Sequence, residues 1–221
     1  MLVEIDKHGM ISHARVRHAR SPQIERGKRV GAITGIVVHQ TDADTLTSSL
    51  NSYRNPKANG AHFLIDKDGT IYQTAAIYQR TNHVGPLKAR CLITGKCAPR
   101  DFPAKAGATT IHRIEMRKAP HERYPGNMQA IGIEMVGRAK MPEGFRPTTR
   151  QLELTPEELR GEIAVFPTPT AAQNQSLSWL VLVLENSMQI ATSEVFRHPV
   201  VSSKNKTEAE GANWTLPVRT P

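Results

Sequence analysis

Long hydrophobic runs and aromatic residues are scarce in this chain of 221 residues. The longest apolar run covers residues 179–184, whereas a helix needs about 20 apolar residues to cross a bilayer. No apolar segment follows the basic residues near the N-terminus, so we expect neither a membrane span nor a secretory signal peptide. Aromatic side chains make up 5% of the chain, too few to predict a stacking platform for single-stranded nucleic acid.

Acidic residues are outnumbered by basic ones, with 20 Asp and Glu against 29 Lys and Arg and a formal net charge of +9. Such a charge favours polyanionic partners, namely nucleic acid, acidic lipid or an anionic cell-wall polymer. Basic residues crowd the first 29 positions without interleaved aromatics, a pattern that a solvated basic face explains. We therefore expect no nucleic-acid partner.

The two cysteines, Cys91 and Cys97, are separated by five residues. They predict free thiols in a reducing compartment and a short disulfide-closed loop in an oxidising one. A zinc pair is disfavoured because no second Cys/His pair stands at a matching spacing. We favour the disulfide, and with it action outside the cytosol.

Apolar patterning predicts several strands. Residues 32–39 form a run rich in β-branched residues that is typical of a buried strand, and residues 130–136 form another. The Asp68-Gly69 pair between residues 62–65 and 70–74 predicts a hairpin.

Helix signals lie between and after these strands. Asp44 is expected to cap a short helix. Thr170 is expected to cap a long helix over residues 171–188, whose apolar positions follow the i, i+3, i+4, i+7 rule. Strands mixed with helices in one continuous chain predict a single α/β domain with a central mixed β-sheet flanked by helices.

The domain is expected to span residues 31–221, preceded by a basic N-terminal extension over residues 1–30. Two stretches, at about 86–128 and 141–169, are rich in Pro, Lys and Arg and have little periodicity. Loops of that length are uncommon in compact domains and are often functional. We interpret both stretches as long loop insertions at the rim of a cleft, the second with a short helix that starts near Thr155.

Four titratable residues stand at positions in the sequence that suggest a catalytic metal site. His39 ends a buried strand, and His198 precedes a proline in the loop after the long helix, ten residues before Glu208. Two neutral imidazoles and one carboxylate hold zinc while leaving its fourth position for water, as in catalytic sites. Glu134 lies within a buried strand, where an unpaired carboxylate is costly. A role as general base beside the metal would account for it.

The order of five segments is what identifies a family. VVHQTDA, GAHFLIDKDGTIYQTA, TNHVG, IGIEMVG and RHPVVSSKNKTEAEGANW follow one another from about residue 31 to residue 214. In that order they resemble the zinc-dependent N-acetylmuramoyl-L-alanine amidases, the superfamily of peptidoglycan recognition proteins and lysozyme-like phage amidases. The two insertions have no counterpart in this resemblance.

The resemblance implies a zinc site and the fold of that superfamily. A strand-end histidine, a late histidine and a later Asp or Cys bind zinc in the family, and these positions fall on His39, His198 and Glu208. The third ligand departs from the family pattern, because Glu has one more methylene than Asp. Glu210 is the alternative third ligand, although it does not have the expected spacing.

The resemblance also implies a mechanism. The glutamate of the IGIE segment acts as general base, which carries over to Glu134, while a zinc-bound water is the nucleophile. The lysine two residues before the third ligand, here Lys206, is expected to stabilise the oxyanion. Phage members use a tyrosine where this chain has Ala61, which favours the Glu134 route. Three further residues are expected to line the substrate groove, with a structural role as the alternative for each: His62, Asn82 and His83.

The implied substrate is peptidoglycan or muropeptides, cleaved at the amide bond between N-acetylmuramic acid and L-alanine. The alternative is a recognition module that binds peptidoglycan without cleaving it. The insertions, the cysteine pair and the basic surface favour an antibacterial effector or a lysin, exported without a signal peptide and acting in the periplasm or cell wall. An immunity protein or a secretion machine would then be its partner. A cytoplasmic enzyme that cleaves recycled muropeptides is the other alternative.

Overall fold

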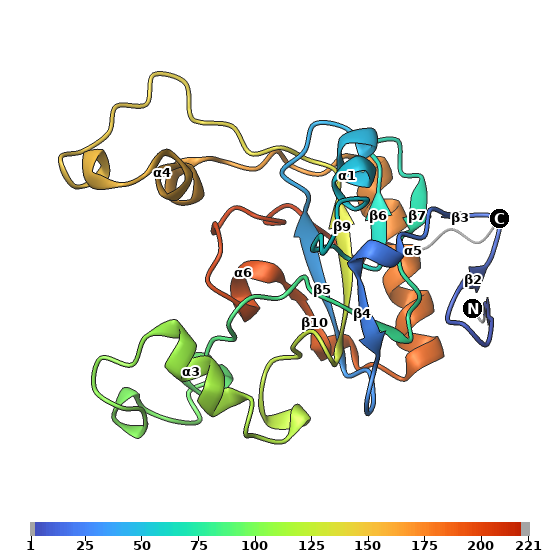
Figure 1. Cartoon of the computed structure of the whole chain (residues 1–221), viewed down its shortest axis with the longest axis horizontal. Helices are drawn as coiled ribbons and strands as arrows, with labels where there is room; N and C mark the ends of the chain where they lie inside the picture. The colour runs from blue at the N-terminus through green and yellow to red at the C-terminus, as the bar shows by residue number, and fades with distance from the viewer. Residues whose placement is uncertain (1–2, 218–221) are drawn as a thin grey trace.

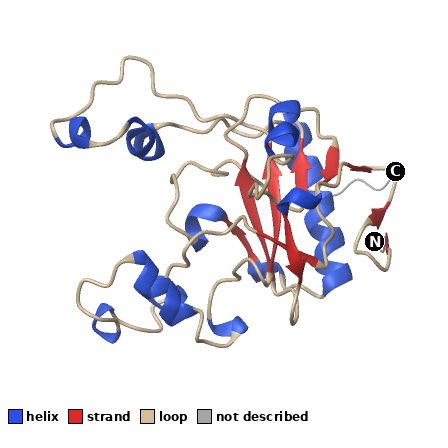
Figure 2. Cartoon of the chain, in the orientation of Figure 1, coloured by secondary structure: helices blue, strands red, loops and turns tan. Residues whose placement is uncertain are grey.

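The computed structural model describes residues 3–217 and has a mixed six-stranded sheet at its centre (Figures 1 and 2). Its strand order is β10-β5-β9-β6-β7-β3. The strands are β3 (Val16–His18), β5 (Gly35–Gln40), β6 (Phe63–Ile65), β7 (Ile71–Gln73), β9 (Ala130–Met135) and β10 (Val195–Arg197). β10, β5, β9 and β6 pair in parallel, and β7 is antiparallel to β6 and parallel to β3. The expected α/β fold around a mixed sheet is confirmed.

Alternation along β5 and β9 gives the sheet one apolar face and one face with polar groups. Ile36 and Val38 belong to the main core, together with Ile133 of β9. His39 and Glu134 alternate with these residues and point to the other face. The two strands pair in register, with His39 opposite Glu134.

Helix α5 (Ala171–Met188) packs on the apolar face, where Leu177, Leu180 and Leu184 join the main core (Figure 1). Thr170 caps it as expected, because its hydroxyl accepts a hydrogen bond from the Gln173 N–H. None of the helices among residues 3–217 is long and apolar enough to span a membrane.

The expected hairpin joins β6 to β7 through a turn closed by Asp66 and Thr70. Gly69 has a φ of +87° in this turn, and a Cβ there would lie 2.8 Å from the Ala172 carbonyl oxygen. The turn therefore needs glycine both for its backbone conformation and for its close packing against the first turn of α5.

The short helix after β5 starts one residue later than expected. α1 (Leu46–Ser52) is capped by Thr45, whose hydroxyl accepts from the Ser48 N–H. Asp44 instead forms an ion pair with Arg138 at 3.0 Å. The nearby cation therefore draws the carboxylate away from the cap, and the neighbouring hydroxyl replaces it.

The N-terminal segment, expected as an extension, takes part in the fold. β3 forms the edge of the central sheet, β1 (Glu4–Ile5) pairs with β2 (Ile11–Ser12), and β4 (Glu25–Lys28) pairs with β8 (Gln79–Thr81). A 3₁₀ turn, η1 (Pro22–Ile24), stands between β3 and β4. Strands this short, set among Arg and His residues, carry too little hydrophobic alternation to be recognised from sequence.

The two insertions project from the same side of the molecule (Figure 1). The first, residues 86–128, is called the lobe; its elements are α2 (Arg90–Ile93), η2 (Pro99–Asp101), α3 (Ala108–Glu115) and η3 (Pro120–Glu122). The second, residues 141–169, is called the arm; its elements are η4 (Arg150–Glu153) and α4 (Pro156–Ile163). α4 begins after Thr155, as expected. Between lobe and arm lies α6 (His198–Val201), which follows η5 (Thr192–Glu194) and β10.

Specific contacts hold the lobe in place. Cys91 and Cys97 form a disulfide, which is the alternative that we favoured from the sequence. Arg90 makes two hydrogen bonds, of 2.9 and 2.6 Å, to the carboxylate of Glu194 before β10. The bidentate ion pair ties the start of the lobe to the central sheet.

Candidate metal centre and active site

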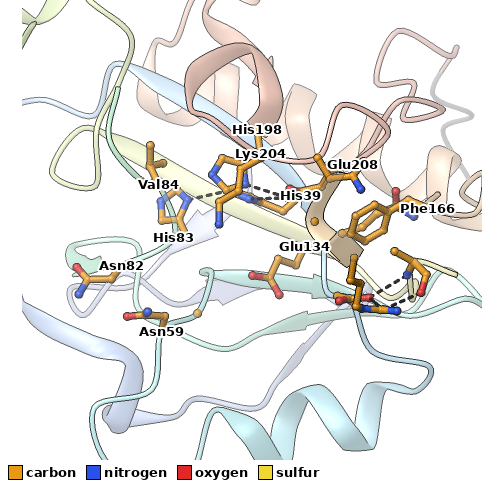
Figure 3. Close-up of a pocket in the computed structure, with 18 of the residues that line it drawn as sticks. His39, Asn59, Asn82, His83, Val84, Glu134, Phe166, His198, Lys204 and Glu208 are labelled. Carbon is orange, nitrogen blue, oxygen red and sulfur yellow. Dashed lines mark hydrogen bonds and ion pairs between the residues drawn. The ribbon is translucent and has the colours of Figure 1, made fainter. Parts of the chain in front are cut away.

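A polar cavity of about 720 Å³ opens on the face of the sheet opposite α5, and Figure 3 shows its side chains. Strand ends supply its floor, the 82–85 loop and the residues after α6 supply its walls, and part of the arm closes one side. The lining residues used below are His39, Asn82, His83, Glu134, Arg160, His198, Lys204 and Glu208.

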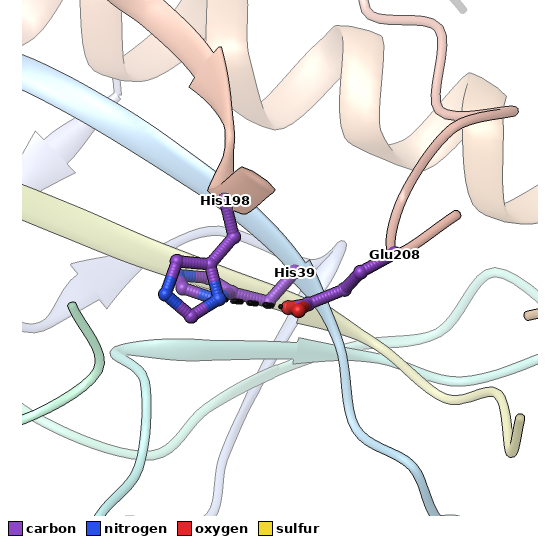
Figure 4. A group of neighbouring side chains, drawn as sticks. All are labelled: His39, His198 and Glu208. Atoms are coloured by element: carbon purple, nitrogen blue, oxygen red, sulfur yellow. Dashed lines mark hydrogen bonds and ion pairs between the residues drawn. The ribbon is translucent and has the colours of Figure 1, made fainter. Parts of the chain in front are cut away.

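His39, His198 and Glu208 converge in this cavity with one ligand atom each, all within 4.8 Å of one another (Figure 4). The Nδ1 atom of His198 lies 2.9 Å from Glu208 Oε1, and the Nδ1 atom of His39 lies 3.4 Å from the same oxygen. His39 belongs to the end of β5, and His198 directly follows the parallel neighbour β10. Carboxyl ends of parallel strands meet at one edge of a sheet, which brings two sequence-distant histidines together.

The electrostatics of this cluster suit a cation. Burial and the neighbouring His198 lower the pKa of His39 to about 4, so its imidazole is neutral at neutral pH. Burial acts to raise the pKa of Glu208, but the hydrogen bond with His198 and the close contact with the His39 ring outweigh it and lower that pKa to about 2. A neutral imidazole and an ionised carboxylate are the forms in which these side chains bind metal.

Glu134 faces the same cavity from β9 (Figure 3). Burial raises the pKa of its carboxyl to about 7, although a hydrogen bond from Tyr53 acts in the opposite direction. That bond runs from Tyr53 Oη to Glu134 Oε2 at 2.7 Å, and the Ala61 N–H donates to the same hydroxyl at 3.1 Å. A carboxyl that titrates near neutrality beside three candidate metal ligands is suited to accept and release a proton.

Two of the expected groove residues line the cavity, and one does not. Asn82 and His83 are in its wall, whereas His62 is fully buried beneath it. The Nδ1 atom of His62 accepts from the Gly132 N–H at 3.0 Å, and its Nε2 lies 2.6 Å from Nη2 of the buried Arg29. These contacts favour a structural role for His62, the alternative at the sequence level.

The expected oxyanion residue, Lys206, is exposed and is not among the residues that line the cavity. Lys204 is in the wall instead, and its charge acts on both His39 and Glu134. Lys204 could not be predicted from the sequence, because the loop between α6 and Glu208 has no periodic pattern that would show which side chains face the cavity. Tyr53 could not be predicted either, because its contact with Glu134 joins residues 81 positions apart in the sequence.

Comparison with known proteins agrees with this geometry. Residues 29–211 match the family model described as N-acetylmuramoyl-L-alanine amidase. The chain belongs to this family. As a member, the protein is a peptidoglycan amidase, and the cavity is its candidate active site.

Several solved structures are similar to the amidase at low sequence identity. AmpD is 16% identical with a TM-score of 0.50, over 94% of this chain and 91% of that chain. A mutant endolysin from Bacillus subtilis is 17% identical with a TM-score of 0.45, over 83% of this chain and 82% of that chain. Drosophila peptidoglycan recognition protein SD is 15% identical with a TM-score of 0.42, over 93% and 97%. The search of curated proteins gives no significant match.

Proposed function

We propose that the amidase is a zinc-dependent enzyme that hydrolyses the amide bond between N-acetylmuramic acid and the L-alanine of the stem peptide. The observation that carries the proposal is the convergence of His39, His198 and Glu208 in the cavity that also contains Glu134.

The residues of the cluster fit zinc. Two imidazoles and one carboxylate form a three-ligand set that leaves a tetrahedral position open. Glu208 stands where the family resemblance implies Asp or Cys, and its longer side chain still brings Oε1 to 2.9 Å from the His198 ring. When bound, zinc supplies Lewis acidity that polarises the scissile carbonyl and lowers the pKa of water from 15.7 to about 7.

Glu134 acts as the general base in this proposal. Its Oε2 is held by Tyr53, which leaves Oε1 to take a proton from the attacking water. With a pKa near 7, the same carboxyl then passes that proton to the leaving amine of L-alanine. One group performs both transfers because its pKa lies close to the working pH.

Two lysines are candidates for offsetting negative charge on the tetrahedral intermediate. Lys206 has the spacing from Glu208 that the family pattern implies, and Lys204 lies in the cavity wall. We assign the role to Lys204, because electrostatic stabilisation requires the charge to lie near the reacting carbonyl. Asn82, which also lines the cavity, is proposed to bind the substrate.

The setting proposed for the enzyme is the cell wall, as an antibacterial effector or lysin. The disulfide of the lobe supports an oxidising compartment. The net charge of +9 supports retention on an anionic wall. Delivery by a secretion machine, and an immunity protein in the producing cell, belong to the same proposal.

The direct test is mass spectrometry of the material that the purified protein releases from intact sacculi, with and without a zinc chelator. Free stem peptides and peptide-free glycan, lost on chelation and restored by zinc, are the expected result. Release that persists under complete chelation would overturn zinc dependence. Binding to sacculi without release would overturn catalysis and leave a recognition module.

A further inference from the structure

His83 lies between the candidate metal ligand His39 and the backbone of β9. Its Nδ1 atom is 3.0 Å from Nε2 of His39, and its own Nε2 is 3.3 Å from the carbonyl oxygen of Ala130. The two rings meet edge to face at a centroid distance of 5.2 Å and an interplanar angle of 80°. His83 therefore touches the nitrogen of His39 that points away from Glu208.

The chemistry of these partners fixes where the protons lie. A carbonyl oxygen only accepts, so Nε2 of His83 must carry the hydrogen and donate it to Ala130. In a neutral imidazole the other nitrogen is then an acceptor. Nδ1 of His83 thus accepts from Nε2–H of His39, which leaves the lone pair of His39 on Nδ1. That nitrogen faces Glu208 and His198.

Two further features hold His83 in this position. The side-chain oxygen of Asn127 accepts from the N–H groups of His83 and Val84 at 2.9 and 2.7 Å, and its amide donates to the Val84 carbonyl at 2.9 Å. Gly132 makes room for the ring, because a Cβ at this position would lie 2.7 Å from Nδ1 of His83. Asn127 therefore fixes the backbone at His83, and the absence of a side chain at Gly132 leaves space for the His83 ring.

We propose that His83 is a positioning residue that fixes the tautomer and ring orientation of His39, so that Nδ1 of His39 is presented to the metal. The proposal rests on the zinc site of the proposed function. The second hydrogen bond of a metal-binding histidine commonly has this effect, and losing it weakens metal affinity. Although His83 lines the cavity, it acts through His39.

The first experiment compares the zinc affinity of two variants by competition with a chromophoric chelator. His83→Asn keeps an acceptor, Oδ1, at the branch position of Nδ1, whereas His83→Leu has similar branching and no acceptor. We expect His83→Leu to bind zinc about 10- to 100-fold more weakly and His83→Asn to stay close to wild type. A role in packing alone predicts the reverse order, with Leu tolerated better than Asn. That order, or two variants equal to each other, would overturn the proposal.

The second measurement needs no variant, and so holds even where a substitution disturbs folding. In the nitrogen-15 spectrum of metal-free wild type, the ring proton of His39 should lie on Nε2 and that of His83 on Nε2. A proton on Nδ1 of His39 would contradict the inference. Wild type that binds no zinc would instead overturn the proposed function, so the two failures are distinguishable.

Discussion

Glu134 and Tyr53 come from distant parts of the chain, and the hydroxyl of Tyr53 lies 2.7 Å from the carboxylate. Burial is the larger influence on Glu134 and raises its pKa to about 7, while the Tyr53 hydrogen bond stabilises the charged form. A general base must be ionised to act, so activity falls as the pH drops below the pKa of Glu134. The positive charge of a bound metal would favour ionisation and place this limit at or below about 7.

Tyr53→Phe should move the acid limb of the pH profile of kcat/KM to higher pH. Removing the hydroxyl withdraws a hydrogen bond from the carboxylate, so the pKa of Glu134 rises and less of the base is ionised at a given pH. Tyr72→Phe is the matched control, because its hydroxyl contacts Arg17 away from the cavity. An acid limb unchanged in Tyr53→Phe, or shifted equally in both variants, would show that this bond does not tune the base.

Lys204 and Lys206, the two candidates for stabilising the oxyanion, can be tested against each other. Lys204→Met should lower kcat by about 10²- to 10³-fold, the usual effect of losing one oxyanion donor, while Lys206→Met should leave it nearly unchanged. Both kcat values can be measured on a soluble muropeptide. Loss in the Lys206 variant alone would return the role to the residue that the family spacing indicates.

The residues of the site that sequence predicts best are those fixed by strand ends. His39 and Glu134 could be singled out because a polar residue at the end of a buried strand, or within one, has few explanations. His198 could be singled out because it precedes a proline in the loop after the long helix. Lys204 and His62 could not be placed, because one depends on an irregular loop path and the other on a buried arginine, Arg29, far away in sequence.

Hydrogen bonds at helix N-caps contribute to the stability of the fold. The hydroxyl of Thr170 accepts from Gln173 N–H and donates to the Lys67 carbonyl, which joins α5 to the β6–β7 turn. Thr155 caps α4 in a similar way, but within the exposed arm.

Thr170→Ala should lower the free energy of unfolding by about 1 kcal/mol, the typical value of an N-cap. Thr155→Ala should cost less in global unfolding, because the arm contributes little to the core. Urea titrations of both variants measure the difference. Equal losses would mean that the arm and the sheet unfold as one unit whose stability depends on both caps.

Elements with strong periodicity or turn chemistry were predictable from sequence, and short ones were not. The long helix α5, the buried strands β5 and β9 and the Asp-Gly hairpin all appear where expected. β3 and α3 were missed, since a strand of three residues and a helix in a Lys- and Arg-rich loop are stabilised by tertiary contacts.

At the scale of the whole molecule, the lobe and the arm project from the same side of the molecule (Figure 1), and Glu157, Arg160 and Gly161 of the arm line the cavity. Charge is unevenly distributed between them. The lobe contains nine Lys and Arg against three Asp and Glu, and so carries six of the nine net positive charges. The side chains of Asp101 and Glu122 accept hydrogen bonds from backbone N–H groups of their own turns. Exposed cations are therefore concentrated in the lobe.

Replacing the exposed cations of the lobe with Gln should weaken binding to sacculi and reduce its salt dependence, because long-range attraction to an anionic polymer is lost. The residues are Lys96, Arg100, Lys105, Arg113 and Arg117. Turnover of a small soluble muropeptide should not change. The control replaces five exposed cations elsewhere, namely Lys7, Arg17, Lys28, Arg54 and Lys57. Equal weakening in both variants would show that binding to sacculi depends on the net charge of the protein and not on the location of the cations in the lobe.

The most direct test of the central claim is a paired measurement on Glu134→Gln: its zinc content, and its release of free stem peptide from a defined muropeptide. We predict one zinc per chain, as in wild type, with turnover reduced by about 10²- to 10⁴-fold, because the ligands remain and the base is lost. Turnover near the wild-type rate would contradict the role of Glu134, and loss of zinc would contradict the assignment of His39, His198 and Glu208 as the complete ligand set.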